Sequence, residues 1–315
     1  MAVQERSLAD PAHRFGISLA CPRCKAAMDD LECFDCDFRM GHSGNLLDAL
    51  LPERVAHYSR FIADYERIRR AEGRGSTHAA FYLNLPYKDI TSANSKQWAI
   101  RARSFSYLLE HILGLTGRGQ SVLDQGAGNG WMSYRLALAG YQPVAVDLLT
   151  NEEDGLGAAI HFCRQLPRPF PRVRAEMDHL PFQDAQFDTI IFNASLHYSE
   201  DYEATLREAL RCTKPGGSLI VCETPWYSRM ESGRQMLKER EANFLKQYGT
   251  ASNSLHSCGF LTDTRLRILE RQLNIQWSVH QPYYGFNWAM RPVIAKLRNL
   301  REPSQFRIYV ARRNA

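Results

Sequence analysis

The stretch Leu123-Asp-Gln-Gly-Ala-Gly-Asn-Gly130 decides the fold class of this 315-residue chain. An apolar run at 121–123 precedes the glycines and a helical pattern at 131–139 follows them, which predicts strand, tight turn and helix in that order. Glycine suits such a turn because the backbone can approach a ligand in conformations that a side chain would block. Dinucleotide-binding proteins use a similar turn, so the turn alone does not identify the ligand.

Strands and helices alternate after this turn. This alternation predicts a Rossmann-like, doubly wound α/β fold around a mostly parallel sheet, which we expect to have seven strands. The interval 225–273 is too long for a simple connection, so we expect helices there that cover the site. The remaining strands are expected at 143–147, 173–176, 187–193, 218–223, 275–280 and 305–311, and helices at 157–165 and 202–211.

The spacing within and behind the turn narrows the choice of ligand. The glycines follow a GxGxG pattern after Asp124, whereas the dinucleotide fingerprint is GxGxxG. Asp147 ends the second strand, where a carboxylate can accept both hydroxyls of a ribose. Three further motifs follow in order: Asp178-His-Leu-Pro-Phe182, Leu196-His-Tyr198 and Lys214-Pro-Gly-Gly217.

This ordered set, over about residues 119–225, resembles the large class I S-adenosylmethionine-dependent methyltransferase family (methyltransferase type 11), which includes the quinone-biosynthesis C-methyltransferases. The resemblance implies S-adenosylmethionine as the cofactor. It implies that the glycine turn lines the methionine part, that Asp147 holds the ribose and that Asp178 accepts from the adenine amino group. The residues implied to bind the cofactor in this region are Asp124, Gly126, Gly128, Gly130, Asp147, Leu148, Met177, Asp178, His179 and Asn193.

Two residues are candidates for the catalytic centre. The resemblance implies that Asn193 ends the fourth strand beside the methyl donor and that His197 matches the first histidine of a Leu-His-His stretch, with Tyr198 in place of the second. His197 is either a general base or a half-buried histidine whose hydrogen bonds are satisfied, and we favour the second interpretation. In-line positioning supplies much of the acceleration of methyl transfer, so an obvious base is not required.

The segment before the glycine turn is expected to be a helical linker and lid. Helices are expected at 45–72 and 95–113. The lid candidates for cofactor contact are Tyr82, Tyr87, Trp98 and Arg101, of which the arginine would pair with the cofactor carboxylate. Structural packing is an equally good interpretation for each of them.

Four cysteines near the amino terminus have the spacing of a metal site. Cys21-Pro-Arg-Cys24 and Cys33-Phe-Asp-Cys36 are separated by eight residues. Each CxxC aims two sulfurs at one point, so two of them predict a four-cysteine structural zinc ribbon. A dithiol redox pair would need a thioredoxin-like context, which this segment lacks.

These elements predict a domain plan. We expect a zinc ribbon at 1–44, a helical linker and cofactor lid at 45–118, and a methyltransferase domain at 119–315 with insertions at about 226–273 and 282–303. No apolar run approaches the roughly 20 residues of a membrane span, and the first twenty residues do not read as a secretory signal. A cytoplasmic protein is therefore expected.

The sequence leaves the acceptor open. The leading hypothesis is a methyltransferase that acts on a small metabolite, for example in natural-product or sugar biosynthesis. Because a zinc knuckle before such a domain resembles bacterial ribosomal RNA guanine-N1 methyltransferases, an RNA base methyltransferase is the alternative; the net charge of +5 permits RNA without demanding it. A cofactor-binding protein with a non-methylating role is the third hypothesis.

The segment 282–288 is rich in aromatic residues and is followed by basic ones. These residues could stack on a substrate ring, contact RNA or form an ordinary insertion. The oligomeric state stays open.

Overall fold

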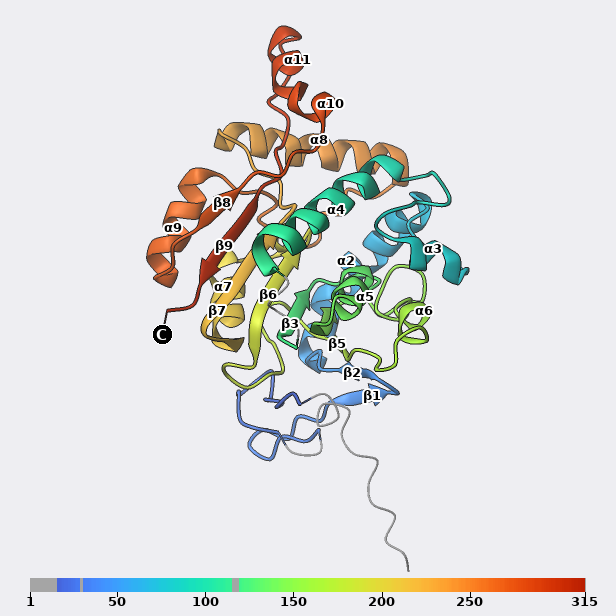
Figure 1. Cartoon of the computed structure of the whole chain (residues 1–315), viewed down its shortest axis with the longest axis vertical. Coiled ribbons are helices and arrows are strands. Elements are labelled where there is room, and N and C mark those ends of the chain that lie inside the picture. Colours follow the sequence, from blue (N-terminus) through green and yellow to red (C-terminus); the bar gives the residue numbers. More distant parts are fainter. Residues whose placement is uncertain (1–15, 29–30, 115–118, 315) are drawn as a thin grey trace, which may run out of the picture.

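A computed structural model of the chain describes residues 16–28, 31–114 and 119–314 (Figure 1). Its centre is a nine-stranded sheet in the order β1-β2-β5-β4-β3-β6-β7-β9-β8. The strands are β1 Gly41–Ser43, β2 Leu46–Asp48, β3 Ser121–Gln125, β4 Gln142–Asp147, β5 Arg172–Arg174, β6 Phe187–Asn193, β7 Thr213–Cys222, β8 Ser278–His280 and β9 Ile308–Arg312.

Most of the sheet is parallel, as the alternating pattern predicted. Strands β5, β4, β3, β6 and β7 run in one direction, and β9 and β8 close one edge in antiparallel pairing. These seven strands form the expected Rossmann-like sheet. The prediction of a seven-stranded sheet is nevertheless wrong, because a β1–β2 hairpin extends the sheet beyond β5.

The extra hairpin lies where the sequence predicted the beginning of a helix. Leu46, Leu47, Leu50 and Leu51 fit a helical period, but Leu47 is buried and pairs in parallel with Val173 of β5. The helix instead begins at Pro52, a residue that suits the first helical turn because it has no N–H to leave unpaired. Pairing with a distant strand has therefore overridden the local pattern.

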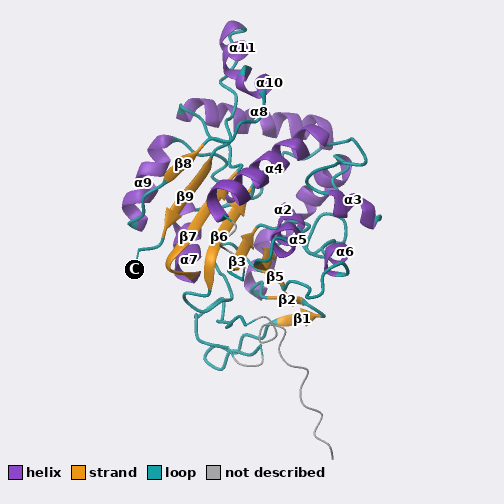
Figure 2. Ribbon diagram, viewed as in Figure 1, coloured by secondary structure: helices purple, strands orange, loops and turns teal. Residues whose placement is uncertain are grey.

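Helices cover both faces of the sheet (Figure 2). One core lies between the sheet and α3, α4, α5 and α6. The other lies between the sheet and α7, α9 and the cysteine-rich segment, residues 18–40. The helices are α2 Pro52–Ala71, α3 Ala79–Asn84, α4 Ser95–Tyr107 with its π-helical continuation η1 Leu108–Leu113, α5 Trp131–Leu138, α6 Ile160–Cys163, η3 Leu196–Tyr198, α7 Tyr202–Cys212, α8 Met230–Tyr248, α9 Asp263–Leu273, α10 Phe286–Ala289 and α11 Arg291–Leu297.

The cysteine-rich segment packs directly on the α/β domain. Leu19 forms a β-bridge with Phe182, and the N–H of Ala20 donates to the carbonyl of Pro181 at 3.1 Å. Cys21 and Cys33 are buried in the same core as Phe182. The segment therefore completes one face of the sheet.

Two long connections follow the parallel strands. The interval 225–273 contains α8 and α9, in agreement with the helices expected there. Between β8 and β9 the chain makes a second excursion, whose helices α10 and α11 project beyond α8 in Figure 1. Among the described residues, no helix has the length and apolarity needed to cross a membrane.

Candidate active site

A pocket lies at the carboxyl ends of β3, β4 and β6, where α/β proteins of this architecture bind ligands. It encloses about 1100 Å³, part of it open to solvent. Its walls come from the glycine turn, the strand ends, α2 and α4. The residues predicted to contact the cofactor that line it are Trp98, Arg101, Asp124, Gly126, Gly128, Asp147, Leu148, Met177, Asp178 and Asn193.

The glycine turn has the backbone conformation that the motif requires. Gly126, Gly128 and Gly130 all have positive φ, at 76°, 57° and 81°. A Cβ on Gly126 would lie 2.3 Å from the Cβ of Ser195, whereas one on Gly128 would meet only the carbonyl oxygen of Asp154 at 3.6 Å. Gly130 stands outside the pocket lining; it begins α5, and a Cβ there would press on Ala159 at 3.1 Å.

Two buried carboxylates fix the turn. Asp147 accepts from the N–H of Gly128 at 2.7 Å and from the N–H of Leu149 at 2.8 Å, one bond to each oxygen. Asp124 accepts from the N–H and the hydroxyl of Ser133 at 3.1 and 2.8 Å. Burial raises the pKa of Asp124 to about 7 and that of Asp147 to about 6. Each Asp147 oxygen keeps a lone pair, so the carboxylate can still accept from a ligand hydroxyl.

Asp178 and His179 form a pair at the pocket edge. Their Oδ1 and Nδ1 atoms are 3.0 Å apart. Burial alone would raise the pKa of Asp178, but the hydrogen bond and the charge of His179 outweigh it and lower that pKa. Only Asp178 of the pair lines the pocket, so His179 orients this carboxylate from behind.

The structure places Tyr82 and Tyr87 away from the pocket. The Tyr82 hydroxyl lies 2.6 Å from the carbonyl oxygens of Ser76 and Glu153, and its buried ring stacks on His161. Tyr87 is exposed, with the guanidinium of Arg135 at 5.0 Å from its ring. Both contacts support the packing interpretation for these two residues.

His197 also lies outside the pocket lining. Its Nδ1 atom is buried and has no hydrogen-bond partner among the residues that the structure describes. Burial, together with the charges of Arg240 and Arg101, lowers its pKa to about 3. The ring is therefore neutral at pH 7 and a weak base, which argues against a general base, but within the described residues its Nδ1 atom lacks the partner that a satisfied histidine would have.

Helix α2 supplies pocket residues that the sequence analysis missed. Tyr58, Phe61 and Tyr65 line the pocket together with Tyr198 and Leu255. The rings of Phe61 and Tyr65 lie 5.9 and 5.6 Å from that of Tyr198. The helical period showed that α2 has a buried face, but it held no information about what that face covers.

Some residues that line the pocket have polar side-chain atoms without partners. Both amide atoms of the buried Gln125 side chain and the indole nitrogen of Trp98 lack hydrogen-bond partners within the described part of the chain. The Arg101 guanidinium lies 4.6 Å from the Trp98 ring and 3.8 Å from a carboxylate oxygen of Glu223. Buried polar groups are normally satisfied, so these atoms fit a ligand that brings polar groups of its own.

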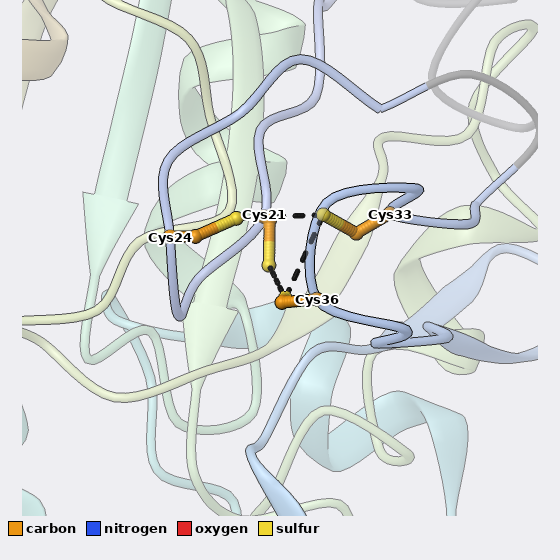
Figure 3. Close-up of side chains that lie close together, drawn as sticks. All are labelled: Cys21, Cys24, Cys33 and Cys36. Atoms are coloured by element: carbon orange, nitrogen blue, oxygen red, sulfur yellow. Dashed lines mark hydrogen bonds between the residues drawn. The ribbon is translucent and has the colours of Figure 1, made fainter.

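The four cysteines of the amino-terminal segment converge as their spacing predicted (Figure 3). The sulfurs of Cys21 and Cys36 are 3.4 Å apart, those of Cys24 and Cys33 are 3.4 Å apart, and those of Cys33 and Cys36 are 3.6 Å apart. All four sulfurs lie within 4.8 Å of one another. The arrangement can hold one metal ion with four thiolate ligands.

Comparison with known proteins agrees with this geometry. Residues 123–221 match the family model described as "Methyltransferase domain". The matched segment runs from β3 to β7 and contains the glycine turn, Asp147 and Asp178. This part of the chain is therefore a class I S-adenosylmethionine-dependent methyltransferase domain.

Individual relatives in sequence match about a third of the chain. The chain is 37% identical to demethylmenaquinone methyltransferase of Mycobacterium marinum over 107 residues, which are 34% of this chain and 42% of the relative. It is 36% identical to demethylmenaquinone methyltransferase of Mycobacterium tuberculosis strain H37Rv over the same length and shares. The match thus spans less than half the length of these relatives.

A solved structure of geranyl diphosphate methyltransferase with GPP and sinefungin shares the fold. Its TM-score is 0.50 at 15% identity, over 70% of this chain and 84% of that chain.

Proposed function

We propose that the protein is an S-adenosylmethionine-dependent methyltransferase that transfers a methyl group to an oxygen, nitrogen or carbon nucleophile of a small metabolite. The observation that carries this proposal is the convergence of the glycine turn, Asp147 and Asp178 on one pocket at the carboxyl edge of the sheet. The unpaired polar atoms of Gln125 and Trp98, two of its lining residues, support the fit of a polar ligand.

The residues of this pocket would divide the work of binding. Asp147 would hold a ribose through the free lone pairs of its carboxylate, and Asp178 would accept from an adenine amino group. The bound cofactor supplies a methyl group already activated on a sulfonium. Asn193 and Gln125, at the ends of β6 and β3, would then position the acceptor.

The aromatic cover favours a small, ring-containing acceptor. Tyr58, Phe61 and Tyr65 come from one helix and leave apolar ring surface at the pocket. Demethylmenaquinone, the compound in the names of the relatives, contains a quinone ring. A quinone-like acceptor is therefore the form of the proposal that the similarity supports best.

RNA is the weaker candidate as acceptor. The three basic residues of the described cysteine-rich segment already have acidic partners within the protein: Arg23 with Glu53 at 2.8 Å, Lys25 with Glu208 at 2.5 Å and Arg39 with Glu32 at 2.7 Å. These cations would have to exchange partners before they could bind phosphates.

The four-cysteine cluster supports a structural zinc ion. Zinc–sulfur bonds of about 2.3 Å in a tetrahedral site separate sulfurs by roughly 3.8 Å. Three of the sulfur pairs here are 3.4 to 3.6 Å apart and all four sulfurs lie within 4.8 Å of one another, so small shifts of the side chains would accommodate the ion. Four protein ligands leave no open position for water, which is the pattern of a structural rather than a catalytic site.

Calorimetry with S-adenosylmethionine tests the cofactor site. We expect binding by the purified chain and a loss of at least about tenfold in affinity for Asp147→Asn, which replaces an acceptor oxygen by a donor. Asp184→Asn is the matched control, since Asp184 is exposed, pairs with Arg211 and does not line the pocket. Equal affinities for both variants would contradict the proposed site.

Labelled methyl transfer tests the activity. Incubation with methyl-labelled cofactor and fractionated cell extract should label a small molecule extracted into organic solvent. Label in RNA would favour the second candidate. Cofactor binding without label in any fraction would support a non-methylating role.

A further inference from the structure

The connection between β8 and β9, residues 281–307, is here called the projecting segment. His280 of β8 pairs with Ile308 of β9, and Ile308 in turn pairs with Cys222 at the carboxyl end of β7. The segment therefore leaves and re-enters the sheet at its carboxyl edge, the edge that carries the pocket. In Figure 1 its two helices, α10 and α11, extend beyond the rest of the molecule.

Large apolar side chains are concentrated on this segment. Among the described residues, fourteen large apolar side chains are exposed, and six of them belong to the projecting segment. Phe286, Leu297 and Leu300 are 69%, 79% and 62% exposed. A concentration of exposed large apolar side chains on one segment is typical of an interaction site. The six residues are Tyr283, Phe286, Val293, Ile294, Leu297 and Leu300.

Positive charge predominates on the segment, in which Glu302 is the one acidic residue. Between Glu270 and Glu302 the sequence contains no aspartate or glutamate, but it contains Arg271, Arg291, Lys296, Arg298 and Arg301. Arg301 is bound to Glu239 at 2.8 Å, whereas Lys296 and Arg298 are exposed on and just after α11. A second copy of the same surface would place like charges together, so an anionic partner is the complementary one.

Aromatic packing holds the segment in its extended position. The buried Tyr284 places its hydroxyl 2.9 Å from Ser104 of α4, and its carbonyl accepts from the Arg103 guanidinium. Trp288 packs on Phe306 at 5.3 Å, with the Arg291 guanidinium 3.9 Å above the Trp288 ring. The contacts of Tyr284 thus fix the base of the segment against α4.

We propose that the projecting segment docks the protein on an anionic membrane surface. Phe286, Leu297 and Leu300 would enter the boundary between headgroups and acyl chains, and Lys296 and Arg298 would face lipid phosphates. Nucleic acid would match the cations but would leave the aliphatic side chains in water. A bilayer surface matches both, and this surface goes beyond the proposed function and does not depend on it.

Co-sedimentation of the full chain with vesicles tests the proposal. We expect binding to phosphatidylcholine vesicles that contain phosphatidylglycerol, at least about tenfold stronger than to phosphatidylcholine alone, because each basic residue near an anionic surface adds attraction. The double variant Lys296→Glu/Arg298→Glu should abolish this preference. Leu297→Ser should weaken binding to the anionic vesicles, while Leu138→Ser, an exposed leucine on α5, should bind like the wild type.

Three outcomes would overturn the proposal. They are absence of binding to anionic vesicles, equal binding by Leu297→Ser and Leu138→Ser, and tighter binding to a polyuridylate RNA than to the vesicles. A fourth outcome comes from sedimentation equilibrium. If the wild type is a dimer and Phe286→Ser is a monomer, the surface binds a second copy of the chain and the proposal is overturned. Circular dichroism and thermal unfolding check that each variant is folded, which the exposure of the substituted side chains leads us to expect.

Discussion

At the scale of single residues, the glycine turn is held by contacts that come from three strands. Asp147 at the end of β4 binds the N–H of Gly128, and Ser195 after β6 packs against Gly126 and donates to the carbonyl of Gln125 in β3. Substitutions here should therefore change both the stability of the fold and the shape of the pocket.

Gly126→Ala should destabilise the protein by about 2 kcal/mol or more, since strain at positive φ costs roughly 1–3 kcal/mol and the new Cβ would also clash with Ser195. Gly216→Ala is the matched control: its φ of 74° is almost the same as the 76° of Gly126, and its Cβ would meet nothing within 4 Å. Urea unfolding measures both variants. Equal losses would show that the contact with Ser195 contributes nothing.

The buried Asp124 should make stability depend on pH in a definite direction. Burial raises its pKa from 3.8 to about 7, so the folded state favours the neutral carboxyl group. Its contribution is fully present below the unfolded pKa and is lost as the pH rises toward 7. At about 1.4 kcal/mol per pKa unit, this loss is on the order of 4 kcal/mol.

The comparison with Asp124→Asn isolates this contribution, because asparagine is neutral at every pH. The free energy of unfolding of the wild type, relative to the variant, should fall between about pH 4 and pH 7 and level off above that range. A difference that rises with pH over this range would show that the folded state stabilises the ionised carboxylate instead.

At the scale of elements, the sequence predicted those that local pattern determines. The limits of β6 agree at both ends with the predicted 187–193, and α7 begins at Tyr202 as expected, with Asp201 capping its first turn. β2 was missed because its three residues are a strand only through pairing with β5, about 125 residues later in the chain. The same limit applies to the site. The carboxylates Asp147 and Asp178 could be predicted from local motifs, whereas the pocket face of α2 depends on contacts with Tyr198 and Leu255.

The cysteine-rich segment should couple metal binding to the stability of the whole domain. We expect about one zinc ion per chain, lost in Cys33→Ser and retained in Cys163→Ser, whose cysteine is buried away from the cluster. Because Cys21 and Cys33 share a core with Leu180 and Phe182, chelation should also lower the melting temperature of the α/β domain. Metal analysis and calorimetric unfolding would provide both readings. An unchanged melting temperature after zinc removal would show that the two parts are energetically separate.

At the scale of the whole molecule, one pocket gathers segments that are far apart in sequence. Its lining includes α2, the loop after β6 and Leu255 in the connection between α8 and α9. A ligand bound there would tie these segments together and oppose their local opening.

Hydrogen exchange should therefore slow in all three segments when S-adenosylmethionine is added. Helix α9 serves as the internal control, because none of its residues lines the pocket. Slowing confined to the glycine turn would show that α2 and Leu255 take no part in cofactor binding.

Because β9 lies between β7 and β8 in the sheet, β7 stays without this neighbour until the ribosome has synthesised nearly the whole chain. β7 is complete at residue 222, but the strand that pairs with it begins only at residue 308. At about 5–20 residues per second, synthesis leaves the edge of β7 without its neighbour for several seconds. During that time an apolar strand, Leu219 to Cys222, has an open hydrogen-bonding edge in a crowded cell. We therefore expect this edge to be a site of aggregation in the nascent chain until β9 has been synthesised.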